Sequence, residues 1–161
     1  MIFQVMNRTN AKKYSYKTHG HKYIIISISD IGDSANKFNK SSELVDVLRL
    51  WFDDEEAPHP NCITSKDAEK IVNFVNKYVD KVDEIVVHCS AGVSRSAGVC
   101  GAIMCILTGS DDYIFDNPNF CPNMTCYRAV LNAYFGSYDD EEVKRKEAKS
   151  IEVWRKANGL D

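Results

Sequence analysis

The sequence contains no hydrophobic run long enough to cross a membrane or to act as a secretory signal. Its apolar opening, residues 1–6, is followed at once by Asn7 and Arg8, whereas a membrane-spanning helix needs about 20 apolar residues. We therefore expect a cytoplasmic protein without a membrane span.

An excess of positive charge is also lacking. The chain has 20 basic and 23 acidic residues, which leaves a formal net charge of −3. Proteins that bind nucleic acids present a broad positive field to the phosphate backbone. No nucleic-acid partner is expected, and any recognition of an anion must be local.

Cysteine is present, but not in a metal-binding pattern. The six cysteines do not form two close pairs, which is the usual spacing in a zinc site. His19 and His21 are close in sequence but have no cysteine or carboxylate beside them. A chain of this length does not need disulfides to fold, so the thiols are expected to be reduced. No metal is predicted.

The length of the chain limits the number of domains. A chain of 161 residues with 44% hydrophobic residues is long enough for one well-packed domain and too short for two ordinary ones, so a single domain over residues 1–161 is expected. Apolar, β-branched runs predict strands at 2–6, 23–29, 44–52 and 85–87. Helical spacing and cap residues predict helices at 34–41, 64–79, 96–107, 124–135 and 139–158.

The order of these elements indicates the fold class. Because strands alternate with helical segments, the predicted fold is α/β, with a central, mainly parallel sheet of four to five strands flanked by helices on both faces. The polar stretch at 7–22 is expected to be a surface loop with room for a second short strand. Asp111, Asp112 and Asp116 are expected to be helix caps and surface residues.

Residues 84–107, EIVVHCSAGVSRSAGVCGAIMCIL, form the stretch with the clearest chemical meaning. An apolar, β-branched run leads into a tight polar loop that contains Gly92, and a small, apolar helix begins near Arg95. Such a loop gathers backbone N–H groups around one point, with the positive end of the helix dipole behind them. The stretch therefore predicts a cradle for a phosphate-sized anion.

Two residues of this loop supply reactivity. Cys89 stands at the start of the loop, where the N–H groups and the helix N-terminus favour a thiolate, so it is the candidate nucleophile. Arg95, six positions further on, offers a planar fork of donors that can hold two oxygens of a transferring phosphoryl group.

Residues 88–96, HCSAGVSRS, resemble the signature of the cysteine-dependent protein tyrosine phosphatase superfamily, and the chain is most similar to its dual-specificity branch. The resemblance implies a cysteinyl-phosphate intermediate, no cofactor, and a phosphorylated protein or peptide as partner. It implies that His88 orients the loop and favours the thiolate, and that Ser96 donates to the departing sulfur. It also implies that the remaining loop residues bind phosphate together with Arg95: Ser90, Ala91, Gly92, Val93 and Ser94.

An acidic segment follows the strand predicted at 44–52. Asp53, Asp54, Glu55 and Glu56 precede two prolines, so this segment is expected to be an exposed loop. The leaving oxygen needs a proton, which a carboxylic acid on a mobile loop can supply. The resemblance implies that this acid lies just beyond the strand, which favours Asp54 and leaves Asp53 as the alternate. The other carboxylates are expected only to be solvated.

The predicted function is hydrolysis of phosphotyrosine in proteins, with phosphoserine and phosphothreonine as further candidates. The loop carries no lysine, unlike the superfamily members that act on inositol phospholipids. One alternative is a phosphoinositide, inositol-phosphate or RNA-triphosphate phosphatase that uses the basic residues of segment 12–22. Two others are an inactive phosphoprotein-binding module and a sulfur-transfer domain. The sequence does not indicate an oligomeric state.

Overall fold

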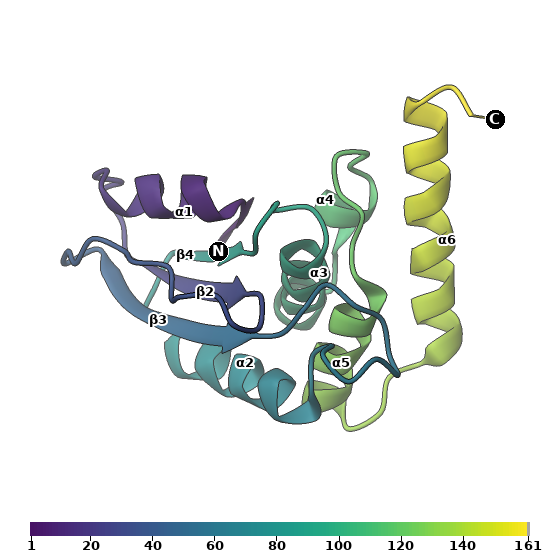
Figure 1. Cartoon of the computed structure of the whole chain (residues 1–161), viewed down its shortest axis with the longest axis horizontal. Helices are drawn as coiled ribbons and strands as arrows, with labels where there is room; N and C mark the ends of the chain where they lie inside the picture. Colours follow the sequence, from purple (N-terminus) through teal and green to yellow (C-terminus); the bar gives the residue numbers. More distant parts are fainter. Residues whose placement is uncertain (161) are drawn as a thin grey trace.

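Four apolar runs form a parallel sheet in the computed structural model, which describes residues 1–160 (Figure 1). The order across the sheet is β1-β4-β2-β3, and each neighbouring pair is parallel. The strands are β1 (Ile2–Met6), β2 (Tyr23–Ser29), β3 (Leu44–Trp51) and β4 (Glu84–His88). This arrangement confirms the predicted α/β fold with a mainly parallel sheet.

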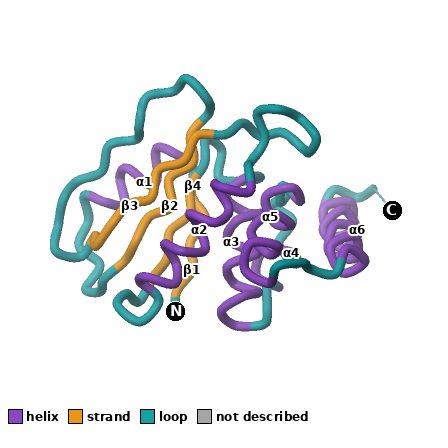
Figure 2. Tube along the Cα trace, turned by 90° about the horizontal axis from the view of Figure 1, so that it is seen from below, coloured by secondary structure: helices purple, strands orange, loops and turns teal. Residues whose placement is uncertain are grey.

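Helices cover both faces of this sheet. In the described chain they are α1 (Arg8–Ser15), α2 (Ser65–Tyr78), α3 (Arg95–Thr108), α4 (Asp112–Phe115), α5 (Met124–Phe135) and α6 (Asp140–Ala157). α1 lies on one face, α2 and α3 lie on the other, and α5 packs against both of the latter (Figure 1). α6 stands beyond α4 and α5, on the side away from the sheet (Figure 2). No helix in the described part of the chain has both the length and the apolar character needed to span a membrane.

The central strands β2 and β4 are buried at every residue, because both of their faces are covered. Ile24 and Ile28 of β2 belong to the larger core, which they share with residues of α2, α3 and α5. Tyr23 points to the other face, where its ring meets the ring of Tyr14 from α1 edge-on at 5.3 Å. Alternate side chains of β2 therefore pack into two separate hydrophobic clusters, one on each face of the sheet.

The stretch at 7–22 contains helix α1, so the prediction of a surface loop there is wrong. Asn7 caps the helix, because its side-chain oxygen accepts a hydrogen bond from the Asn10 N–H at 2.7 Å. Ala11 and Ser15 are the buried residues of this helix. The sequence prediction relied on apolar periodicity, which a helix that buries one alanine and one serine does not show.

The helix predicted at 34–41 is absent from the described chain, and an irregular loop takes its place. Arg8 donates to the Ser34 carbonyl at 2.7 Å, and the Asn36 side chain donates to the Arg8 carbonyl at 3.1 Å. These contacts with a distant part of the chain fix the loop against α1, and a local pattern could not predict them.

Asp111 is a third correction, because it is 1% exposed rather than a surface residue. Its carboxylate pairs with Lys146 of α6 and accepts a 2.6 Å hydrogen bond from the Tyr127 hydroxyl of α5. A buried carboxylate needs such partners. Asp112 and Asp116 do lie at the surface, as predicted.

The parallel sheet also sets the place of the functional loops. Met6, Ser29, Trp51 and His88 end the four strands, and all four strands run in the same direction. The segments that follow these residues therefore meet at one edge. Ligand sites of open parallel sheets form at this carboxyl edge.

Candidate active site

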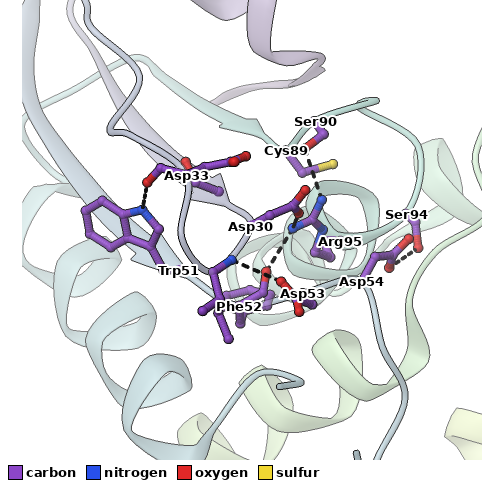
Figure 3. A network of polar contacts seen from close by, with 12 residues as sticks. Asp30, Asp33, Trp51, Phe52, Asp53, Asp54, Cys89, Ser90, Ser94 and Arg95 are labelled. Carbon is purple, nitrogen blue, oxygen red and sulfur yellow. Dashed lines mark hydrogen bonds and ion pairs between the residues drawn. The ribbon is translucent and has the colours of Figure 1, made fainter. Parts of the chain in front are cut away.

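The loop after β4 forms a ring of residues 89–95, which we call the cradle (Figure 3). Cys89 lies at its base and is 2% exposed. The sulfur accepts a hydrogen bond from the Gly92 N–H at 3.3 Å and lies 3.0 Å from the Ser96 hydroxyl oxygen. Donors of this kind can stabilise a sulfur anion.

The carbonyl groups of the cradle are bonded to the chain around it. The Ser90 carbonyl accepts from the Arg8 N–H at 3.2 Å, and the Val93 and Ser94 carbonyls accept from the N–H groups of Cys121 and Asn123, each at 3.0 Å. These bonds draw the three carbonyls outward. Because a trans peptide directs its N–H opposite to its carbonyl, the N–H groups that follow these carbonyls turn toward the centre of the ring, which is the position for an anion. This is the geometry expected of a phosphate-binding loop.

Glycine is required at the middle of the cradle. Gly92 has a φ of +69°, a region that side chains rarely adopt. A Cβ atom at this position would also lie 2.5 Å from the backbone of Met6 and Asn7, at the junction of β1 and α1. The end of β1 therefore presses directly on the cradle, and only glycine fits between them.

Arg95 opens α3, closes the cradle and is 4% exposed. Its Nη1 donates to the Asp30 carboxylate at 2.5 Å and to the Phe52 carbonyl at 2.8 Å. Its Nη2 donates to the Ser90 hydroxyl at 3.2 Å. The loops after β2 and β3 thus hold the outer end of the guanidinium (Figure 3).

The inner edge of the same guanidinium is free. Arg95 Nε is buried and has no hydrogen-bond partner among the described residues. An unpaired buried donor is unfavourable unless a ligand supplies the acceptor. Because Nε and Nη2 share one edge of the planar fork, this edge suits two oxygens of a phosphoryl group.

Asp54 lies beside the cradle, where Figure 3 shows its carboxylate next to Ser94. One carboxylate oxygen accepts from the Ser94 hydroxyl at 2.8 Å and from the Asn123 side-chain amide at 2.9 Å. Ser94 occupies the N-cap position of α3, but its side chain makes no capping bond to the helix. Its hydroxyl instead joins the cradle to the acidic loop.

Asp53 has a different environment. One of its carboxylate oxygens accepts from the Ile31 N–H at 3.0 Å, and the other accepts from the Asn61 side-chain amide at 3.2 Å. These bonds tie together the loops that follow β2 and β3. Of the two candidate acids, Asp54 contacts the cradle and Asp53 supports the surrounding loops.

His88 ends β4 and is fully buried. Its Nδ1 lies 3.1 Å from the Cys89 carbonyl, which can only accept, so Nδ1 carries the proton. Nε2 then accepts from the Ser27 hydroxyl at 2.6 Å. Burial lowers the pKa of His88 to about 4. The positive charges of nearby arginines also lower this pKa, whereas the hydrogen bond to the Cys89 carbonyl raises it. A neutral imidazole therefore fixes the first peptide of the cradle.

The structure brings two further polar side chains to the site, Asp30 and Asn123, which the sequence analysis did not single out. Asp30 follows β2 at the same edge of the sheet as Cys89, so its position after a strand was the available signal. Asn123 caps α5 by accepting from the Cys126 N–H at 3.0 Å, and its amide donates to Asp54. A capping role could be read from sequence, but the contact with Asp54 depends on the tertiary fold.

The basic residues of segment 12–22 do not all reach this site. Lys17 and Lys22 are exposed and precede β2, so they lie toward the amino edge of the sheet. A seven-residue strand spans about 23 Å, which separates that edge from the cradle. These two lysines therefore lie away from a substrate that is bound at the cradle.

Comparison with known proteins gives one family. Residues 1–110 match the family described as dual specificity phosphatase, catalytic domain. No curated protein sequence matches the chain.

Comparison with solved structures gives matches at low sequence identity, of which human DUSP28 shows the same fold. Human DUSP28 is 14% identical with a TM-score of 0.51, and the match covers 96% of this chain and 94% of that one. A mouse putative dual specificity phosphatase, solved with zinc tungstate, is 15% identical with a TM-score of 0.49 over 96% and 84% of the chains. The human tyrosine phosphatase-like serine/threonine/tyrosine-interacting protein is 17% identical, with a TM-score of 0.45 over 83% and 78%.

Proposed function

The chain belongs to the dual specificity phosphatase family, and we propose that it hydrolyses phosphotyrosine, together with phosphoserine or phosphothreonine, in proteins. One domain over residues 1–161 carries this activity. The observation that supports it best is the pairing of a hydrogen-bonded, buried Cys89 sulfur with a free edge of Arg95 across one small ring.

The first step forms a cysteinyl phosphate. The Cys89 sulfur attacks phosphorus in line with the ester oxygen, so that an S–P bond forms while the P–O bond breaks. Arg95 and the cradle N–H groups hold the equatorial oxygens as charge develops on them. Asp54 gives its proton to the leaving oxygen, which departs as the free hydroxyl of the substrate.

The second step returns the enzyme to its starting state. A water molecule attacks phosphorus and gives a proton to the Asp54 carboxylate, while the S–P bond breaks. The Ser96 hydroxyl, 3.0 Å from the sulfur, stabilises the thiolate as it leaves. Inorganic phosphate is the second product.

The charge around the cradle supports a protein substrate. The carboxylates of Asp30 and Asp54 stand on opposite sides of Arg95 (Figure 3), and Glu55 and Glu56 are exposed on the acidic loop. Negative groups at the mouth disfavour a substrate with a second phosphate near the first, because like charges repel. A single phosphorylated side chain avoids this repulsion.

The nucleophile is tested with Cys89→Ser, assayed on p-nitrophenyl phosphate in the presence of a chelator. We expect turnover to fall to background, because a serine hydroxyl is a far weaker nucleophile than a thiolate at neutral pH. Cys121→Ser is the matched control, since Cys121 is an exposed thiol outside the cradle. Turnover retained in Cys89→Ser would exclude the mechanism.

The substrate class is tested separately, by comparing kcat/KM of the wild type on phosphotyrosine peptides, phosphothreonine peptides and inositol polyphosphates. The phosphotyrosine peptides should be hydrolysed fastest. Faster turnover of an inositol polyphosphate would overturn the substrate class while leaving the cysteine mechanism intact.

A further inference from the structure

We propose that the exposed indole of Trp51 binds an arginine side chain of the substrate, close in sequence to the phosphorylated residue. The proposal rests on the proposed function and adds a substrate class to it, namely phosphopeptides with a basic residue near the phosphorylated one. Trp51 ends β3 at the carboxyl edge of the sheet, where the cradle also lies. Figure 3 shows Asp33 and Asp30 between this indole and Cys89.

The indole of Trp51 is held in one orientation but is not covered. Its Nε1 donates to the Asp33 carbonyl at 3.0 Å, which ties the end of β3 to the loop after β2. The residue is nonetheless 41% exposed. Among the described residues, no aromatic ring or cation stacks on it. A large aromatic side chain that is fixed at its polar end and bare on its ring is suited to contact another molecule.

The surface beside Trp51 continues to the cradle. Ile31 is exposed, and its N–H is bonded at 3.0 Å to Asp53, the second residue after Trp51. Ile31 directly follows Asp30, whose carboxylate pairs with Arg95 of the cradle. A peptide whose phosphoryl group lies in the cradle can therefore reach Ile31 and then Trp51 within a few extended residues, at about 3.3 Å each.

The charge around the indole determines which side chain fits there. The Asp33 carboxylate is exposed and has no hydrogen-bond or ion-pair partner in the described part of the chain. Asp30 is also partly exposed. A cation is attracted both by these carboxylates and by the face of a tryptophan ring. Arginine fits best, because its planar guanidinium stacks on an aromatic ring while its apolar stem can lie on Ile31.

Strand β3 already contains one pair of this kind. Two residues before Trp51, the guanidinium of Arg49 stands 5.7 Å from the centre of the Phe38 ring. That pair is internal to the chain, so the ring of Trp51 is the one left for a cation from outside. The second tryptophan, Trp154, is 45% exposed and lies on α6, on the side away from the sheet (Figure 2). It is therefore a control of the same residue type and similar exposure.

The first experiment measures hydrolysis of phosphotyrosine peptides in which arginine, leucine or glutamate replaces alanine, one position at a time on both sides of the phosphotyrosine. We expect arginine at one position to raise kcat/KM by about 3- to 10-fold, through a lower KM. Leucine and glutamate should give no such increase.

Four variants test whether Trp51 causes this preference. Trp51→Ala should abolish it, Trp51→Phe should keep part of it because an aromatic face remains, and Asp33→Asn should reduce it by about twofold. Trp154→Ala should retain it in full. Turnover of p-nitrophenyl phosphate, which has no peptide chain, should stay within about twofold of the wild type in all four variants.

The second experiment follows binding without turnover. The chain has two tryptophans, so Trp154→Phe leaves Trp51 as the only one. In the double variant Cys89→Ser, Trp154→Phe, titration with the arginine peptides should change the fluorescence emission of Trp51 for the position at which arginine reaches it. The alanine peptide and inorganic phosphate should leave this emission unchanged.

Three results would contradict the proposal. These are equal kcat/KM for arginine and alanine peptides at every position, an arginine preference that survives in Trp51→Ala, and a preference for leucine over arginine. The second would assign the basic residue to another part of the rim, and the third would make Trp51 an apolar contact. A wild type without any turnover would instead refute the proposed function, and the fluorescence titration would still decide whether Trp51 binds the arginine.

Discussion

Two adjacent aspartates differ in what they contact, and this difference separates their roles. Asp54 accepts hydrogen bonds from Ser94 of the cradle and from Asn123, whereas Asp53 accepts from Ile31 and Asn61 in the flanking loops. Sequence favoured Asp54 but left Asp53 as the alternate. These contacts predict that substitution of Asp54 affects the reaction rate more than substitution of Asp53.

Asp54→Asn should lower kcat by about 100-fold or more on a phosphopeptide, because the leaving oxygen then departs without a proton. The loss should be smaller on p-nitrophenyl phosphate, whose leaving group is good. Asp53→Asn should keep most of the activity but lower the free energy of unfolding by about 1 kcal/mol, since it disturbs two structural hydrogen bonds. Steady-state kinetics and urea unfolding of both variants measure this. A larger kinetic loss in Asp53→Asn would move the acid to Asp53.

Between elements, the close approach of α3 and α5 places Asn123 over the cradle. A Cβ atom on Gly98 of α3 would overlap the Asn123 carbonyl oxygen. Asn123 in turn holds Asp54. Gly98 of α3 therefore leaves room for Asn123 at the start of α5, and Asn123 in turn positions Asp54, the proposed acid.

Gly98→Ala should displace Asn123, reduce kcat on a phosphopeptide by about tenfold or more and lower the free energy of unfolding by about 1–3 kcal/mol. Gly101→Ala is the control in the same helix, because its Cβ would meet side-chain atoms at 3.4–3.6 Å, which is ordinary contact. That variant should keep full activity and be as stable as the wild type or more stable, by up to about 1 kcal/mol. Equal kinetics in the two variants would disprove the coupling.

Elements with strong apolar patterns were predictable, and those held by long-range polar contacts were not. β2 is a continuous apolar, β-branched run, and α2 has apolar residues at helical spacing, so both are visible in the sequence. The loop at 34–41 depends on Arg8 and Asn36, which meet only in the folded chain. The same distinction applies to the site. The cradle is one contiguous motif, whereas the contact between Asp54 and Asn123 joins residues 69 positions apart.

For the whole molecule, the buried imidazole of His88 links stability to pH. The pKa of His88 is about 4 in the folded chain, against about 6.5 when unfolded. Between these values the unfolded state binds more protons, so the contribution of His88 to stability is present above pH 6.5 and is lost as the pH falls toward 4.

The free energy of unfolding should fall by about 3 kcal/mol from this residue alone over that interval. His88→Asn removes the titrating group, so its stability should depend less on pH across the same range, whatever its stability at pH 7. Urea unfolding of both proteins at pH 7, 6, 5 and 4 measures the difference. Parallel curves for the two proteins would show that His88 is not buried as a neutral group.

Three strands of one parallel sheet place Asp30, the proposed acid Asp54 and the proposed nucleophile Cys89 at a shared edge. A peptide limited to residues 84–107 would retain the whole recognisable signature and yet be inert, because its arginine would have neither Asp30 nor the Phe52 carbonyl to hold it. We therefore expect turnover to require the assembled sheet. During denaturation, enzymatic activity should serve as a reporter that disappears in step with cooperative loss of the entire fold.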